Sequence, residues 1–504
     1  MSGRLNDRRS PRRGPVLPAA SPVRVSRAAG VGGVLAGMLA RVGSESGWRA
    51  WARQVEHAGH CSRPVRVRGG AAAVDGRTGE VRAEYSTAGE PDGVLLLACG
   101  DRRAAVCPAC AERYRRDTWH VVAAGLRGRA PSVPGGPDAV PDSVAGHPVV
   151  LATLTAPSFG AVHRAGARPC RKRVGPLVCE HAMRAWCDER HGDGERLVGR
   201  PLCWDCYDYS GHVLWHSAVP ELWRRTVIYT YRALARLGSA RSGIPITVRT
   251  VREQLRVSFV KVAEFQRRGA VHLHAVVRLD GVAGEGVAAP PAWADSALLE
   301  DAIRDAAGRV AVSLPVGGRV ARWGEQLDVA PIADPARAAS YLAKYATKTA
   351  GDVLSGLPPR RFGRREVGRI SRRVDNPHTM LLVLACLRLS RTPECAGLRL
   401  AEHVHMLGFR GHFATKSRSY SVTLGTLRGV RRAWRARERA ERVGAADPWA
   451  GQDEGTVVVR DWRFVASGWA RLGDADLAAT LARDHAAMRD AEDLVTVARA
   501  GDLW

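Results

Sequence analysis

The chain has 504 residues, 45% of them hydrophobic, and a formal net charge of +26. This length allows roughly two to four domains, and so large a positive charge predicts a polyanionic partner, most commonly nucleic acid. The Arg-rich N-terminus lacks the apolar core of a secretory signal, and the longest apolar run, near 31–40, is too short to span a membrane. We therefore expect a cytoplasmic protein without a membrane partner.

The first third of the chain alternates between polar and structured segments. Residues 1–56 predict an Arg-rich disordered arm (1–30) and then a short helix. Residues 57–125 hold a first group of cysteines, and the Pro- and Gly-rich stretch 126–147 predicts a linker. After it, VLATLTAPS is β-branched and alternating, which predicts a strand at about 148–156.

The first cysteine group has the spacing of a structural zinc site. In a cytoplasmic chain, C-x-x-C pairs indicate Zn²⁺ rather than disulfides. Cys107-x-x-Cys110 supplies half of a tetrahedral site, and we expect Cys61 and Cys99 to complete it. The imidazoles that compete for the fourth position are His57 and His60.

The second group, within 165–215, has more candidate zinc ligands than one ion uses. They are Cys170, Cys179, His181, Cys187, His191, Cys203 and Cys206. Cys203-x-x-Cys206 is the firmer half of a site. For the other half we choose Cys187-x-x-x-His191, with Cys179 and His181 as alternates. Because seven candidates exceed one tetrahedral site, some are spare or a second ion is present.

A hairpin expected at about 254–279 is the most informative stretch. His272 and His274 lie two residues apart on a strand, so both side chains project from one face. If Arg267–Gly269 is a three-residue loop with its glycine at positive φ, Glu264 pairs with His272 and shares that face. A loop of two or four residues would turn Glu264 to the opposite face.

Two imidazoles and one carboxylate leave coordination positions open for a substrate. Such a mixed nitrogen and oxygen set suits Mg²⁺ or Mn²⁺ acting on a phosphate. We therefore predict a catalytic metal ion held by His272, His274 and Glu264. The alternative is that His-x-His is an incidental exposed pair.

A helix expected at 335–351 carries two tyrosines interleaved with two lysines. Its segment YLAKYATK places on one stripe the side chains of Tyr341, Lys344, Tyr345 and Lys348. A phenol has a pKa near 10 and is a poor nucleophile alone, whereas nearby ammoniums favour the phenolate and neutralise a phosphate. The alternative is an ordinary amphipathic helix with half-buried tyrosine rings.

Further helices are expected at 221–238, 296–311 and 377–390. Residues 352–430 form a basic and aromatic extension, and 431–504 predict a helical tail. Basic residues interleaved with aromatic ones at 405–421 suit DNA backbone contacts and base stacking, and the expected DNA-binding residues are Arg410, Lys416 and Arg418. An equal alternative is a loop and strand packed on the preceding domain. Since no phosphate-cradling Gly–Lys loop is visible, we expect a host helicase to unwind the DNA.

Three segments of the chain, in the order VLATLTAPS, HLH and YLAKYATK, resemble the motifs of replication initiators of the HUH endonuclease class. The Y-x-x-K-Y-x-x-K form resembles the two-tyrosine branch of that class. The chain is more closely similar to the replication initiators of actinobacterial plasmids and integrative conjugative elements (the RepSA-like family), over about 57–430. The segments that carry this similarity are CGDRRAAVCPAC, PLCWDCYDYSGHVLWHSAVPELWRR, EFQRRGAVHLH, SYLAKYATK and HMLGFRGHFATKSRSYS.

The resemblance implies an α+β fold, with an antiparallel-sheet HUH core at 148–351, zinc-ribbon-like insertions and a helical C-terminal region. It also implies that the metal polarises a scissile phosphate of single-stranded origin DNA. One tyrosine attacks, leaving a 5′-phosphotyrosyl bond and a free 3′-OH that primes a host polymerase, and the second performs the later strand transfer. Motif alignment favours Tyr341 as the first nucleophile, although Tyr345 occupies the same frame.

Two other functions compete with this interpretation. A relaxase or transposase would use the same chemistry, but relaxases tend to carry three histidines and a tyrosine that precedes them, whereas here the tyrosines follow. A non-catalytic zinc-ribbon DNA-binding regulator would explain the charge and the cysteines. It would not explain the histidine pair or the tyrosine stripe.

Overall fold

The chain divides into two compact units. Unit 1 comprises Met1–Gly100, Cys107–Cys110 and Ala446–Trp504, and unit 2 comprises Asp101–Val106 and Ala111–Ala445. Both contain helices and antiparallel sheets, which confirms the α+β class. The computed structural model describes residues 31–129, 140–283, 286–348, 350–354, 356–443 and 455–501, so the expected arm at 1–30 lies outside it. Within those ranges, no helix has the length and apolarity needed to cross a bilayer.

The sheet of unit 1 is built from both ends of the chain. Its central strand β1 (Val65–Asp75) pairs antiparallel with β12 (Thr456–Ser467) on one side. On the other side β1 pairs with β2 (Val81–Ser86) and β3 (Leu95–Leu97). The helices of this unit are α1 (Val31–Val42), α2 (Glu45–His57) and α12 (Asp474–Gly501).

The prediction of a helical tail over 431–504 is wrong at β12. Helices α11 (Leu424–Val443) and α12 flank it, but TVVVRDWRFVAS forms a strand along the whole of β1. Its β-branched and aromatic residues suit a pleated strand. Its pairing partner β1 lies near the other end of the chain, so the sequence around β12 alone did not reveal that this segment joins a sheet.

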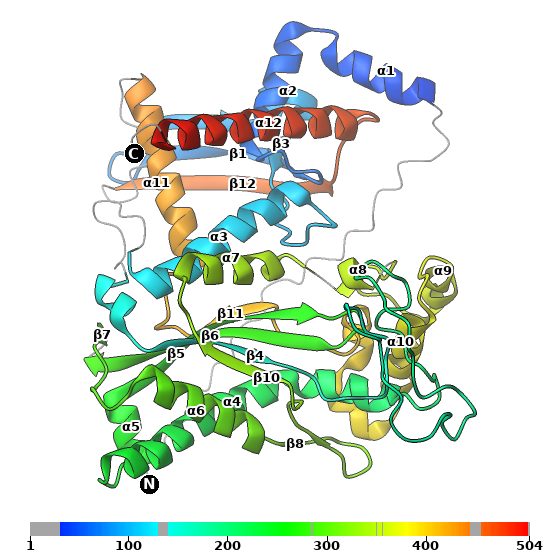
Figure 1. Cartoon of the computed structure of the whole chain (residues 1–504). Coiled ribbons are helices and arrows are strands. Elements are labelled where there is room, and N and C mark those ends of the chain that lie inside the picture. The colour runs from blue at the N-terminus through cyan, green and yellow to red at the C-terminus, as the bar shows by residue number, and fades with distance from the viewer. Residues whose placement is uncertain are drawn as a thin grey trace, which may run out of the picture. The chain divides into compact units, whose positions relative to one another are not determined.

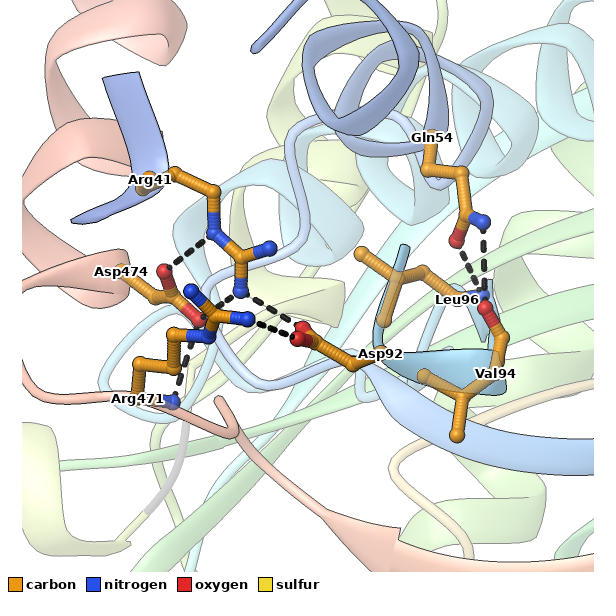
Figure 2. A network of polar contacts seen from close by, with 7 residues as sticks. All are labelled: Arg41, Gln54, Asp92, Val94, Leu96, Arg471 and Asp474. Carbon is orange, nitrogen blue, oxygen red and sulfur yellow. Dashed lines mark hydrogen bonds and ion pairs between the residues drawn. The ribbon is translucent and has the colours of Figure 1, made fainter. Parts of the chain in front are cut away.

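A buried polar network, shown in Figure 2, fastens the first helix of unit 1. The guanidinium of Arg41 donates to both carboxylate oxygens of Asp474 at 2.9 Å and to Asp92 at 2.6 Å. Arg471 donates to the other oxygen of Asp92 at 2.8 Å, and Gln54 accepts from the backbone of β3 at 2.9 Å. Because both carboxylates are paired with guanidinium groups, the buried charges of this network are compensated.

The main sheet of unit 2 is antiparallel, in the order β10-β4-β6-β5-β11, with β7 paired to β6. Its strands are β4 (Val149–Leu154), β5 (Leu255–Phe265), β6 (Val271–Ala283), β7 (Gly286–Ala288), β10 (Leu327–Pro331) and β11 (Ala414–Lys416). A separate pair consists of β8 (Val312–Ser313) and β9 (Val320–Ala321). The expected strand at 148–156 and the expected hairpin are thus confirmed as β4 and β5–β6.

Helices cover both faces of this sheet (Figure 1). On one face, Ala152 and Leu154 of β4 share a core with α4 (Tyr209–Ser242) and α6 (Ser296–Arg309). On the other face, Val149 and Leu151 pack in a cluster with α3 (Pro108–Arg127) and α7 (Pro335–Ala346). Since successive strand residues point to opposite faces, the alternation of β4 fixes which helices it meets.

The other helices of unit 2 are α5 (Val248–Gln254), α8 (Ala350–Val353), α9 (Val367–Ser371), α10 (Pro377–Leu389) and α11. The helices expected at 221–238, 296–311, 335–351 and 377–390 are present. However, α4 begins earlier, at Tyr209, and α7 ends at Ala346. Helix α3 extends into the expected linker 126–147, of which residues 130–139 lie outside the described ranges.

Two buried histidines support the turn of the β5–β6 hairpin. Nδ1 of His216 donates to the Leu407 carbonyl at 2.9 Å, and its Nε2 accepts from the Val271 amide at 3.1 Å. Nε2 of His378 donates to the Arg268 carbonyl at 3.0 Å. Burial lowers the pKa of both imidazoles to about 4, and the Arg268 guanidinium adds to the effect. Both rings are therefore neutral near pH 7.

We predict that the protein loses stability as the pH falls from about 6.5 to about 4. An unfolded histidine has a pKa of about 6.5, so in this window the unfolded chain binds protons that folded His216 and His378 do not. The contribution is complete above the window. Within the window, the free energy of unfolding falls by up to about 1.4 kcal/mol for each unit of decreasing pH and each histidine, and below the window this contribution is lost. Urea denaturation at several pH values measures this slope.

The His378→Gln variant cannot titrate at this position, so its slope should be shallower than that of the wild type. His120→Gln, which changes an exposed side chain on α3, serves as the control and should keep the wild-type slope. Equal slopes for all three proteins would contradict the prediction.

Candidate active site

The β5–β6 hairpin gathers the predicted metal ligands on one face. Gln266 and Ala270 close the three-residue loop with a backbone bond of 2.8 Å, and Gly269 has a φ of 78°. Glu264 consequently pairs with His272, which confirms the register expected for such a loop. His274 follows two residues later, so all three side chains point to the face that carries α7.

His274 is the best-connected member of this set. Its Nε2 lies 3.0 Å from Oε2 of Glu264, and its Nδ1 lies 3.1 Å from the hydroxyl of Thr153 on β4. The side chain is almost completely buried. Contacts at both nitrogens fix the orientation of the ring, as neighbouring groups commonly do for metal-binding histidines. Thr153 was not among the predicted site residues, although the alternation of β4 would have placed it on this face.

His272 offers an unused nitrogen. Its Nε2 is buried and has no hydrogen-bond partner among the described residues. Burial lowers the pKa of this imidazole to about 3, so the ring is neutral and its lone pair is available. The ring centroids of His272 and His274 are 6.3 Å apart. A neutral imidazole, a second imidazole and a carboxylate on one face fit an open divalent-metal site.

The tyrosine helix α7 packs directly over these residues. The hydroxyl of Tyr341 lies 3.5 Å from Nδ1 of His274, and the two rings meet edge to face with centroids 5.0 Å apart. The ring of Tyr345 stacks on His274 at 5.2 Å, and the two tyrosine rings are 4.9 Å apart. The structure therefore brings both predicted phenols to the histidine face of the sheet.

The two lysines lie beside Tyr345. Nζ of Lys348 is 4.7 Å from the Tyr345 ring centroid and 3.7 Å from Oε1 of Glu264, while Nζ of Lys344 is 5.8 Å from that centroid. Lys348 follows the end of α7 and is reached through a turn in which its amide donates to the Tyr345 carbonyl at 3.2 Å. The ammoniums thus adjoin Tyr345 and the predicted carboxylate ligand.

Burial raises the pKa of Tyr341 above its ordinary value, and the neighbouring Tyr345 and Glu264 add to the effect. This is opposite in direction to the activation expected from the lysine stripe. Tyr341 is therefore a neutral phenol near pH 7, and it needs another group to accept its proton before it can act as a nucleophile.

The C-terminal end of α7 is held by residues that the sequence did not single out. Arg102 donates to the carbonyls of Ala346 and Lys348 at 3.0 and 3.2 Å, and its guanidinium lies 4.0 Å from the Phe413 ring centroid. The amide of Ala104 donates to the Thr347 carbonyl at 3.4 Å. A guanidinium at a helix C-terminus also interacts favourably with the helix dipole.

The first cysteine group converges as expected. The Sγ atoms of Cys99 and Cys110 are 3.7 Å apart, as are those of Cys61 and Cys107. All four ligand atoms lie within 4.8 Å of one another. All of the cysteines are free, so these distances do not reflect disulfides. The group has the geometry to hold a metal ion.

The predicted grouping of Cys187 and His191 with Cys203 and Cys206 is wrong. Cys187 and His191 converge with His163 and Cys170. Cys203 and Cys206 converge instead with Cys179 and His181, the two residues named above as alternates. Within each group, the four ligand atoms lie within 4.8 Å of one another. His163 was not among the candidates. Spacing along the chain could not distinguish the two groupings because both give tetrahedral sets. The described residues contain these three Cys/His groups at that separation, and the Glu264–His272–His274 set is more open.

The aromatic residues of the segment 405–421 are not available for the base stacking that the sequence had led us to expect. Its aromatic rings are buried in the core: Phe409, Phe413 and Tyr420. The stacking interpretation is therefore wrong, and the alternative of a loop and strand packed on the domain holds. Of the expected DNA-binding residues, Arg410 and Arg418 are exposed, while Lys416 is half-buried on β11 and donates to the carbonyls of Ser417 and Arg418.

Comparison with known proteins points to replication. Residues 47–483 match the family model RepSA, described as replication initiator protein, pSAM2. A replication initiator protein from Streptomyces ambofaciens is 40% identical over 464 residues, which cover 89% of this chain and 93% of that protein. No solved structure matches the chain.

We predict that Arg102→Ala destabilises the protein, because the end of α7 and the turn after it lose two charged hydrogen bonds, and Phe413 loses a cation–π contact. The expected loss in the free energy of unfolding is about 1–3 kcal/mol. Arg102→Lys keeps the charge without the forked geometry and should fall between wild type and Arg102→Ala. Urea denaturation measures all three.

Arg115→Ala provides the matched control, since Arg115 is exposed on α3 and pairs with Glu112 within the same helix. Such a surface pair contributes at most about 1 kcal/mol. The proposed anchoring of α7 is incorrect if Arg102→Ala unfolds at the same urea concentration as Arg115→Ala.

Proposed function

We propose, on the premise that this chain belongs to the RepSA family of replication initiator proteins, that it is a metal-dependent nickase and strand transferase of the HUH class. Its substrate would be single-stranded DNA at a replication origin. The observation that carries the proposal is the meeting of the Tyr341 hydroxyl with Nδ1 of His274 at 3.5 Å. A phenol nucleophile and a divalent-metal ligand would then act on the same phosphate.

His272, His274 and Glu264 would hold Mg²⁺ or Mn²⁺, with the Glu264 carboxylate as the oxygen donor that these ions prefer. When bound, such an ion neutralises and polarises a phosphate oxygen. The chain's own residues supply the orientation: Thr153 contacts one nitrogen of His274, and Tyr345 stacks on the ring. Nε2 of His272, which has no hydrogen-bond partner among the described residues, would be free to bind such an ion.

In the proposed step, the phenolic oxygen of one tyrosine bonds to phosphorus and the bond from phosphorus to the 3′-oxygen breaks. The phenol gives up its proton, and the departing 3′-oxygen takes one to become the 3′-OH that primes synthesis. The product is a 5′-phosphotyrosine. The second tyrosine, 4.9 Å away between ring centroids, would attack in the later transfer that rejoins the strand. This use of Tyr341 and Tyr345 is the two-tyrosine version of the chemistry.

Positive charge supports DNA as the partner. The net charge is +26, and exposed Arg410 and Arg418 lie on the domain that carries the tyrosine helix. Such residues would contact phosphates without reading sequence. We further propose that a host helicase and polymerase complete replication. Zn²⁺ in the group of Cys61, Cys99, Cys107 and Cys110 would have a structural role, because four thiolates leave no open position.

A relaxase or transposase with the same chemistry is the second candidate within this class. The tyrosines follow the histidines in the chain, and the family match favours an initiator. A non-catalytic zinc-ribbon regulator would have no need for two phenols in contact with a buried histidine.

We predict that the protein forms a covalent adduct with labelled single-stranded origin DNA in the presence of Mn²⁺. Tyr341→Phe and Tyr345→Phe should each lower adduct formation or the later rejoining, and the double variant should abolish the adduct. The reason is that phenylalanine keeps the ring contacts with His274 but removes the attacking oxygen. Denaturing gel electrophoresis of the labelled DNA measures the result.

Tyr229→Phe, on α4, is the matched control and should form the adduct at the wild-type rate. An adduct that persists in the double variant would exclude these tyrosines as the nucleophiles. A protein that binds origin DNA without cleaving it would favour the regulator.

We also predict that Mn²⁺ binding depends on the hairpin face. Glu264→Gln and His272→Ala should each weaken Mn²⁺ binding about tenfold or more, because each removes one of three protein ligands. Electron paramagnetic resonance of free Mn²⁺ measures binding without DNA.

His120→Ala removes an exposed imidazole from α3 and should leave the Mn²⁺ affinity unchanged. If all three variants bind Mn²⁺ as the wild type does, the metal lies elsewhere and the proposed ligand set is wrong.

A further inference from the structure

We infer that the segment from His163 to Cys206 is a module with two interleaved Zn²⁺ sites, called here the cross-braced module. The first site consists of His163, Cys170, Cys187 and His191, and the second of Cys179, His181, Cys203 and Cys206. Along the chain, the first pair and third pair of ligands belong to one site, and the second and fourth pairs to the other. Each ion would therefore tie together two segments that the other ion's ligands separate.

The first site has the dimensions of a tetrahedral zinc centre. Ligand atoms bound to one Zn²⁺ are about 3.3–3.8 Å apart, given Zn–S near 2.3 Å and Zn–N near 2.0–2.1 Å. Nε2 of His191 lies 3.5 Å from Sγ of Cys187 and 3.1 Å from Nδ1 of His163, which is 3.7 Å from Sγ of Cys170. These separations match within a few tenths of an ångström.

A carboxylate orients the buried histidine of this site. Nδ1 of His191 lies 2.8 Å from Oε2 of Glu195, and the histidine is 2% exposed. The bond from Nδ1 leaves Nε2, the nitrogen that faces the other three ligands, free to bind a metal. A carboxylate behind a ligating imidazole is the usual support of a protein zinc site. The distances to the other ligands and the hydrogen bond to Glu195 therefore both identify Nε2 of His191 as the metal-binding nitrogen.

The second site repeats these distances with three thiols. Nδ1 of His181 lies 3.2 Å from Sγ of Cys206 and 3.7 Å from Sγ of Cys203, and Cys179 completes the group within 4.8 Å. Thiolate and imidazole ligands without a carboxylate select Zn²⁺ over Mg²⁺ or Mn²⁺. The proposed ions are thus chemically distinct from the one at the hairpin face.

The module itself has little regular secondary structure and few buried apolar side chains. In its described residues, regular pairing is limited to isolated bridges such as Arg171 with Cys187 and Val178 with Arg184. Several of its apolar side chains are exposed, whereas Leu202 near its end is buried; the exposed ones are Val174, Leu177, Val178, Met183 and Leu197. A segment of this size with so few buried apolar side chains normally needs metals or disulfides to hold a fold, and its cysteines are free.

The module packs against the turn of the β5–β6 hairpin. A side chain at Gly199, which has a φ of 88°, would meet the backbone of Arg267 at 2.5 Å. Arg267 in turn donates to the Glu195 carbonyl at 3.4 Å. Glu195 supports His191 and also contacts the turn, so the first zinc site and the turn share a residue. Zinc would therefore fix the surface against which the turn rests.

Zinc content after dialysis against a weak chelator, measured by mass spectrometry of the metal, tests the interleaving in the full chain. The wild type should hold three Zn²⁺, one for each Cys/His group. Cys170→Ser with Cys187→Ser removes two ligands of one site and should leave two ions. Cys170→Ser with Cys179→Ser removes the same number of thiols but damages both sites, and it should leave one ion.

The control is Cys386→Ser with Cys395→Ser, two buried thiols outside the groups, which should keep three ions. The opposite order, with Cys170/Cys187 losing two ions and Cys170/Cys179 losing one, would show sequential sites and overturn the proposal. A wild type that holds a single ion would also overturn it. None of these readouts depends on DNA cleavage, so a failed nicking assay leaves the test intact.

Because the double variants can unfold, the wild-type chain loaded with NMR-active cadmium gives an independent answer. In a proton–cadmium correlation, the β-protons of Cys170 and Cys187 should couple to one cadmium, and those of Cys179, Cys203 and Cys206 to another. Coupling of Cys170 and Cys179 to the same cadmium would refute the interleaved arrangement.

Discussion

The register of β5 against β6 is the constraint on which the candidate site depends. Glu264 stands opposite His272 because the Arg267–Gly269 loop has three residues and its glycine adopts a φ of 78°. A β-carbon at Gly269 would lie 3.0 Å from a methyl carbon of Leu382, so both the backbone and the space favour glycine. A slip of one residue would keep the strands paired but turn Glu264 away from His274.

Several distant parts of the chain hold that turn in place. The guanidinium of Arg268 donates to the carbonyls of Ala156 and Pro157, both at 3.0 Å, which ties the turn to the end of β4. His378 of α10 donates to the Arg268 carbonyl, and Gly199 of the cross-braced module lies against the backbone of Arg267. Contacts from three directions restrict the movements that would change the register. The turn is thus held by contacts with three other parts of the chain.

Local sequence patterns predicted much of this site. What they could not predict is which segments, distant along the chain, come together in the fold. The two-residue period of β6 and the heptad-like stripe of α7 gave the correct side chains for each face, including Tyr341. The local sequence does not distinguish sequential from interleaved grouping of the Cys/His pairs, because either grouping gives four ligands for a tetrahedral metal ion. Phe409 and Phe413 failed as predicted DNA contacts for a related reason. Their rings pack in the core beside Phe265 of β5, which is distant along the chain.

The raised pKa of Tyr341 favours one way of activating the phenol over another. Activation by lysine alone would require ammoniums close to the hydroxyl, yet Lys348 lies over the ring of Tyr345 and pairs with Glu264. Burial instead keeps Tyr341 protonated. Its neighbour within 3.5 Å is His274, whose other nitrogen contacts the carboxylate. On the proposed function, deprotonation would therefore accompany attack on a phosphate held by the metal, and free phenolate would not accumulate beforehand.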